Sequence, residues 1–211
     1  MGFPRNTYII NIFMDKLQTA IAELSNSNPD IRELALDKIG TLKPDNALEI
    51  IVPFLSDPDL EVRGTAACNL GDIGDIRTVS YLIESARQDP EERVRSEALS
   101  ALENYRSPEI LKCLIDEVYR EKRARRPRQI VAQQLQYYND EKAVDGLIIL
   151  LLEDEDVYVR IFAADSLLVL NRPRLLEVWQ EALEDESTYV IEIANKAIFQ
   201  LQNSQELIET G

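Results

Sequence analysis

The sequence predicts an all-α protein, an α-solenoid built from about six stacked helix–turn–helix repeats. Two observations lead to this prediction. Ala, Leu, Glu and Arg recur at helical spacing along most of the 211 residues, and no stretch shows the apolar–polar alternation of a half-buried strand. The chain also repeats itself, because segments that read as acidic turn, helix, short loop and helix follow one another. A single two-helix unit cannot bury its apolar face, so the units are expected to stack.

The repeats set the expected domain boundaries. Four copies open with Asp or Asn, a divergent copy lies before the last of these, and an incomplete copy closes the array. We expect a single solenoid over residues 14–202. Its repeats are expected near residues 28–56, 57–88, 89–120, 121–153, 154–184 and 185–202. Residues 1–13 are expected to form a loose tail without a secretory cleavage site, and residues 203–211 a second tail.

One arginine recurs at the start of the first helix of a repeat. It is found at Arg32, Arg63, Arg95 and Arg160. An alanine follows three residues later in every copy, at Ala35, Ala66, Ala98, Ala132, Ala163 and Ala194. In the divergent copy Gln129 occupies the arginine position, and in the last copy Ile191 does. We predict that the arginines pair with the acidic turns between repeats and join neighbouring repeats, instead of binding a ligand.

These residues carry a resemblance to a known family. The pattern D-x-x-V-R-x-x-A-x-x-A-L, followed by LGDIGD at residues 70–75, resembles the HEAT-type repeats named after the phycobilisome lyases. The resemblance extends over about residues 17–202. It implies a right-handed α-solenoid of HEAT-type repeats and a role in handling phycobiliproteins. A solenoid fold hosts many unrelated functions, so the role is the less specific of the two implications.

The composition excludes several kinds of chemistry. The chain contains no histidine, which excludes Ser-His-Asp and Cys-His catalysis and every His-ligated metal site. The LGDIGD segment lacks the lysine and the preceding strand of a phosphate-binding loop. Cys68 and Cys113 have no evident activating base and are expected to be small buried residues. We therefore predict no catalytic residue, no metal and no cofactor. Two cysteines without a disulfide framework favour a reducing, cytoplasmic location.

A partner-binding groove is predicted on the second helices of the repeats. Their apolar pairs are expected to pack inward, and the residues between the pairs to face a groove. The apolar candidates in this groove are Ile50, Tyr81, Cys113, Ile149 and Val178. The flanking carboxylates are Glu49, Glu84, Asp116, Asp145, Glu177 and Glu181. The apolar residues either pack against adjacent helices or form a stripe for a partner segment with apolar anchors and some basic side chains.

A dense basic segment interrupts this acidic chain, whose formal net charge is −15. It has the sequence EKRARRPRQ over residues 121–129 and contains Lys122, Arg123, Arg125, Arg126 and Arg128. One interpretation is a solvated loop that neighbouring acidic turns neutralise. The other is a site for an acidic partner, a carboxylate ligand or the propionates of a tetrapyrrole, on which Tyr137 and Tyr138 could stack. The negative field of the whole chain opposes binding to nucleic acid and to anionic membranes.

Three functions remain open from the sequence. The first is a non-enzymatic scaffold that binds another protein. The resemblance implies that this protein is a phycobiliprotein, handled in assembly, maturation or turnover in a photosynthetic bacterium. The second is a bilin lyase or lyase subunit that holds phycocyanobilin or a related bilin, with Arg123, Arg125 and Arg126 near the ligand. The third is an unrelated cytosolic adaptor.

Overall fold

The computed structural model describes the backbone of residues 5–120 and 124–209. Within these ranges the chain is helical and contains no strand, which confirms the predicted all-α solenoid class. The chain divides into two compact units, residues 1–105 and residues 106–211. None of the described helices is both long and apolar enough to cross a membrane.

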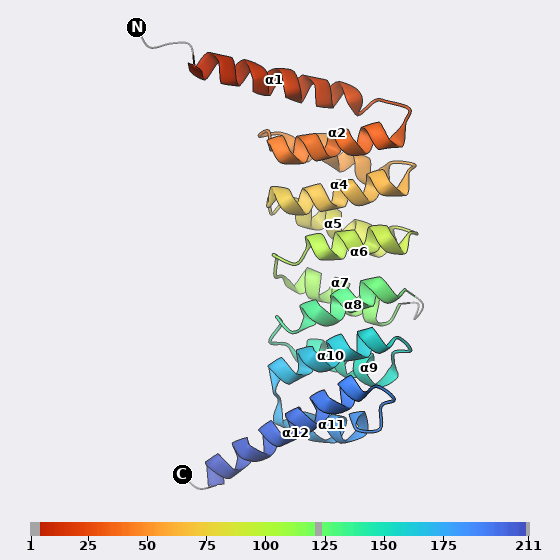
Figure 1. Ribbon diagram of the computed structural model, residues 1–211, viewed down its shortest axis with the longest axis vertical. Coiled ribbons are helices and arrows are strands. Elements are labelled where there is room, and N and C mark those ends of the chain that lie inside the picture. Colours follow the sequence, from red (N-terminus) through yellow and green to blue (C-terminus); the bar gives the residue numbers. More distant parts are fainter. Residues whose placement is uncertain (1–4, 121–123, 210–211) are drawn as a thin grey trace. The chain divides into compact units, whose positions relative to one another are not determined.

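The first unit consists of two layers of helices. Its elements are α1 (Arg5–Glu23), α2 (Pro29–Leu42), α3 (Ala47–Ile51), the 3-10 helix η1 (Val52–Ser56), α4 (Leu60–Ile73), α5 (Thr78–Gln88) and α6 (Glu92–Ala101). Helices α1, α2, α4 and α6 pack side by side in chain order (Figure 1). The shorter second helices, α3 with η1 and then α5, pack against this row.

The second unit repeats this arrangement. Its elements are α7 (Pro108–Val118), α8 (Arg125–Leu135), α9 (Glu141–Glu153), α10 (Val157–Leu170), the 3-10 helix η2 (Pro173–Leu175), α11 (Leu176–Ala182) and α12 (Thr188–Glu209). Helices α8, α10 and α12 pack in succession, and α7, α9 and α11 form the second row (Figure 1).

The recurring small residues set the distance between stacked helices. All six alanines that follow the arginine position are completely buried. Gly71 serves the same purpose, because a Cβ atom at this position would lie 2.7 Å from the Cβ atom of Ala101 on α6. The second glycine of LGDIGD, Gly74, adopts a left-handed conformation with φ of 73° and ends α4. Both glycines of this motif are therefore explained by helix packing and helix termination.

The two ends of the chain are more helical than the sequence suggested. Helix α1 begins at Arg5, within the segment expected to be a loose tail to residue 13. Leu17 and Ala20 of this helix and Leu24 directly after it are buried, and the helix packs against α2. Helix α12 continues to Glu209, past the expected boundary at residue 202.

Candidate functional site

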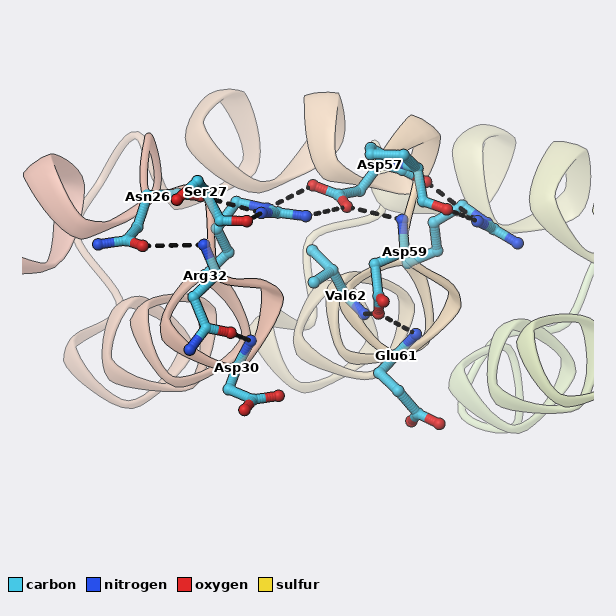
Figure 2. A network of polar contacts seen from close by, with 11 residues as sticks. Asn26, Ser27, Asp30, Arg32, Asp57, Asp59, Glu61 and Val62 are labelled. Atoms are coloured by element: carbon cyan, nitrogen blue, oxygen red, sulfur yellow. Dashed lines mark hydrogen bonds and ion pairs between the residues drawn. The ribbon is translucent and has the colours of Figure 1, made fainter.

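An arginine clamp joins successive repeats in the first unit (Figure 2). The Nε and Nη2 atoms of Arg32 donate hydrogen bonds to Oδ2 and Oδ1 of Asp57, at 2.9 and 2.6 Å. Its Nη1 atom donates to the backbone oxygens of Asn26 and Ser27, in the turn that precedes α2. Asp57 Oδ1 also accepts a hydrogen bond from the backbone N–H of Asp59, at 2.9 Å. One carboxylate thus fixes its own turn and holds the arginine of the preceding repeat.

The same clamp recurs along the chain. Arg63 binds Asp89 through Nε and Nη2 at 2.7 and 3.2 Å, and Arg160 binds Asp185 at 2.8 and 3.2 Å. Arg95 donates through Nη1 to the backbone oxygens of Asp89 and Pro90. These guanidinium groups bind a carboxylate through two nitrogens or bind backbone oxygens, so the arginines have a structural role. We call each ion pair between such an arginine and the aspartate of the next repeat a joint.

The contact with Arg32 also keeps the Asp57 carboxyl ionised. Burial alone would raise the pKa of the Asp57 carboxyl, but hydrogen bonds from Arg32 and from the Asp59 backbone outweigh it. The resulting pKa lies below the ordinary aspartate value. Asp57 is therefore a carboxylate that accepts hydrogen bonds, and it is not suited to act as a general acid near neutral pH.

The divergent repeat keeps this joint with a different residue. The sequence register assigned the arginine position to Gln129, which suggested that this copy had lost its arginine. That interpretation is wrong, because Arg128 binds Asp154 through Nε at 2.6 Å and Nη2 at 3.3 Å. Gln129 instead donates to Asp156 at 3.3 Å. The clamp tolerates a shift of one residue because the long arginine side chain can reach the same acid from the neighbouring position.

The basic segment does not act as a single group of cations. Lys122 and Arg123 lie outside the described residues. Arg128 is 1% exposed in its side chain and belongs to the joint with Asp154, so it is not accessible to a ligand. Arg125 is exposed and lies 3.6 Å from Asp156, and Arg126 is exposed as well. The described part of the segment thus agrees with neutralisation by the neighbouring acidic turn.

The two tyrosines proposed as a stacking platform already have a partner. The guanidinium of Arg106 lies 4.8 Å from the ring centre of Tyr137 and 5.7 Å from that of Tyr138. Such distances are typical of cation–π contacts. A flat ligand that stacked on Tyr137 from the same side would have to displace Arg106.

The predicted groove residues differ in their exposure. Cys113 is 2% exposed and therefore cannot contact a partner, which corrects its assignment to the groove. Ile50, Ile149 and Val178 are half-buried, and Tyr81 is the apolar candidate with the largest exposure, 38%. The six flanking carboxylates are all exposed: Glu49, Glu84, Asp116, Asp145, Glu177 and Glu181. The surface of the second helices is thus more acidic and less apolar than the spacing predicted.

Glu49 and Asp145 form ion pairs with arginines. Glu49 binds Arg77 at 3.0 Å, and Asp145 binds Arg174 at 2.7 Å. Both contacts join adjacent second helices within one unit and are solvent-exposed, so each contributes at most about 1 kcal/mol to stability.

A pocket opens beside Tyr81 in the first unit. It has a volume of about 600 Å³ and is lined by residues of η1, the following turn and α5. One wall of the pocket is apolar and consists of Val52, Pro53 and Leu55. The polar groups come from Tyr81, Glu84 and Ser85. The sequence identified Tyr81 and Glu84 but not Ser85, which the helical pattern alone marks as an ordinary helix residue.

Neither cysteine is suited to be a nucleophile. Burial, followed by a hydrogen bond to Glu97 at 3.2 Å, raises the pKa of the Cys68 thiol to about 12. Cys113 is buried. Among the residues that the structure describes, no group of three or more acidic or cysteine side chains could hold a metal ion. The arrangement of these residues offers binding surfaces and no evident reacting group.

Comparisons with known proteins agree with this geometry. Residues 17–103 match the family model for HEAT repeats. No curated protein matches the sequence. The fold is similar to that of an engineered protein of known crystal structure, with 19% identity and a TM-score of 0.58 over 89% of this chain and 96% of that chain.

A second similar structure is the complex of CpcE and CpcF of phycocyanin lyase from Nostoc sp. PCC7120. It is 21% identical with a TM-score of 0.59, over 84% of this chain and 74% of that chain. At these identities the likeness is one of fold. Residues 17–103 therefore match HEAT repeats, and the same arginine joints recur in the remainder of the described chain, which shares the solenoid fold of these structures.

Proposed function

We propose that this protein is a non-enzymatic scaffold that binds another protein through its second helices, and that this partner is a phycobiliprotein. One observation carries the proposal. The first helices use their arginines to join repeats, whereas the second helices leave six carboxylates and Tyr81 exposed. An exposed tyrosine among charged side chains is typical of a protein-interaction surface.

The choice of partner rests on the fold. CpcE and CpcF are described as components of a phycocyanin lyase, and their fold is similar to that of this chain. The motif that resembles the phycobilisome-lyase repeats supports the same choice.

The test measures binding of purified phycocyanin to the immobilised protein. We expect saturable binding, and we expect the exchange of Tyr81 for alanine to weaken it about tenfold, because aromatic anchors commonly dominate protein interfaces. Tyr158→Ala is the matched control, since Tyr158 is also exposed but lies on a first helix, α10. Absence of phycocyanin binding would reject this partner and leave an unrelated adaptor as the remaining scaffold function.

A bilin lyase subunit is the second candidate, and the likeness to the phycocyanin lyase complex favours it. The protein would then bind phycocyanobilin itself. Its addition should produce a saturable red shift of the bilin absorption that serum albumin does not reproduce. Exchange of Arg123, Arg125 and Arg126 for alanine should reduce this shift. An unchanged spectrum with the wild-type protein would reject this candidate without affecting the scaffold.

A further inference from the structure

We infer that the pocket beside Tyr81 binds a lysine or arginine side chain of the partner protein. This inference rests on the proposed scaffold function and deepens it, because it names the chemistry that one site on the second helices recognises. The site lies wholly within the first unit, between η1 and α5.

The shape of the pocket suits a long aliphatic stem. Val52, Pro53 and Leu55 line one side, and the volume of about 600 Å³ exceeds that of a single side chain. Lysine and arginine side chains bury their methylene groups along apolar surface while their charged ends remain near polar partners. The apolar wall can therefore hold the stem of the side chain.

The polar side of the pocket suits a cation. Glu84 is exposed and forms no ion pair with any described residue, so its carboxylate can accept a charge-assisted hydrogen bond. Tyr81 lines the same pocket and is 38% exposed, which leaves ring surface available for a cation–π contact. A carboxylate beside an aromatic ring provides both kinds of contact that a guanidinium or ammonium group prefers.

Ser85 provides an independent sign of an unmet polar contact. It is 8% exposed, lines the pocket, and its hydroxyl has no hydrogen-bond partner among the described residues. Buried hydroxyls without partners are uncommon in native proteins and each calls for an explanation. The N–H groups of a bound side chain would supply the missing partner.

The remaining charges of the pocket disfavour an anion. Its lining contains three carboxylates, from Asp57, Glu84 and Asp89, and one guanidinium, from Arg63. Arg63 is held by Asp89 and by the backbone oxygens of Asp57 and Pro58, so it is not free to bind an incoming carboxylate or phosphate. The local field therefore favours a positively charged ligand.

The test uses Nα-acetyl-argininamide as the probe and the corresponding citrulline amide as its uncharged analogue. Titration into the ¹⁵N-labelled full-length protein should shift the backbone amide signals of Tyr81, Glu84 and Ser85 saturably with the arginine probe. Glu84→Gln should weaken binding about fivefold, since it removes the charge of a partly exposed pair. Asp165→Asn is the control, because it changes the net charge equally at an exposed acid on a first helix, α10, outside the proposed binding surface. Equal binding of the citrulline probe, or an unchanged affinity in Glu84→Gln, would overturn the proposal.

A competition experiment separates this proposal from the proposed function. If phycocyanin binds but neither excess probe nor Glu84→Gln weakens its binding, the pocket assignment is wrong and the scaffold function stands. If the probe binds as predicted but phycocyanin does not, the pocket assignment stands and the partner is wrong. Loss of phycocyanin binding in Glu84→Gln and not in Asp165→Asn would support both.

Discussion

The joint at Arg63 and the joint at Arg128 reach the same geometry from different local sequences. Both arginines hold an aspartate through Nε, at 2.7 and 2.6 Å. Helix α4, which carries Arg63, is capped by Asp59, whose carboxylate accepts from the N–H groups of Glu61 and Val62. Helix α8, which carries Arg128, follows Ala124 without a side-chain cap and has two further arginines, Arg125 and Arg126, in its first turn.

This difference shows which feature of the repeat the fold requires. Cations at a helix N-terminus oppose the helix dipole, and a missing cap leaves backbone N–H groups without a side-chain partner. The divergent repeat tolerates both, yet it retains an arginine that is 1% exposed against 12% for Arg63. The divergent repeat therefore keeps the ion pair between repeats although it has lost the capping residue that normally starts the helix.

The largest expected effect is the removal of Arg128. Arg128→Met should lower the free energy of unfolding by about 3–5 kcal/mol, because it leaves the Asp154 carboxylate buried without its counterion. Arg63→Met should cost less, about 1–2 kcal/mol, since Arg63 is 12% exposed against 1% for Arg128 and its ion pair is partly screened by water. Urea titrations followed by circular dichroism measure both changes. The double variant Arg128→Met with Asp154→Asn should recover much of the loss, and equal losses in the two single variants would remove the distinction between the joints.

The close approach of α4 and α6 gives the next effect. Helix α8 contains no glycine, whereas Gly71 of α4 would place a Cβ atom 2.9 Å from Ala101 Cα. Gly71→Ala should therefore destabilise the protein by about 1–3 kcal/mol through overpacking. Gly64→Ala is the control on the same helix, since its Cβ atom would meet Glu97 Cγ at an ordinary 3.7 Å. This variant should be neutral or more stable by up to about 1 kcal/mol, and similar losses for both would contradict the packing argument.

The lowered pKa of Asp57, which binds Arg32, predicts that the stability of the protein depends on pH. The folded-state pKa of Asp57 lies below its ordinary value, so its stabilising contribution is present above the unfolded pKa of about 4. It is lost as the pH falls through the folded pKa. Asp57→Asn should be less stable than the wild type at pH 7, by on the order of 1–2 kcal/mol, and this difference should shrink toward pH 3. Thermal unfolding at pH 7, 5 and 3 measures it, and a difference independent of pH would refute the assignment.

The smallest expected effect lies at the helix starts. The backbone amides of Glu61 and Val62 are held by Asp59, at 2.9 and 3.4 Å, whereas α8 has no side-chain cap. Amides in the first turn of α8 should therefore exchange with deuterium about five times faster than their counterparts in α4, which corresponds to roughly 1 kcal/mol of capping. Asp59→Ala should bring α4 to the rate of α8. Equal rates in the wild type would show that the cap has no measurable effect.

The fold could be predicted from the sequence because it depends on features that recur in register. Burial of every alanine at one position follows from helical spacing, since each copy places that residue against the neighbouring helix. The helix over Arg5–Glu23 was harder to predict because it lies outside the repeat and its packing against α2 is a tertiary contact. Boundaries that depend on such contacts are not encoded in the repeat itself.

The candidate site was less predictable, for physical reasons that particular residues show. Spacing assigned both Cys113 and Tyr81 to the groove, but the folded protein buries Cys113 and leaves Tyr81 38% exposed. Spacing likewise assigned Gln129 to the joint, because a sequence register does not show how far the side chain of Arg128 reaches. The pocket with Ser85 arises where η1 and α5 meet, and no local pattern specifies that volume.

Three of the aspartates that open a repeat, Asp57, Asp89 and Asp154, each bind two arginines. The Asp57 carboxylate holds Arg32, while its backbone oxygen accepts from Arg63 Nη1 at 3.0 Å. Asp154 receives Arg128 and Arg160 in the same way. A tandem duplication that began at one such aspartate and ended before the next would add one arginine and one aspartate together. Neither charge would be left without a partner. Arrays of this kind can therefore change length during evolution by gain or loss of whole copies, with no need for compensating mutations at the new boundary.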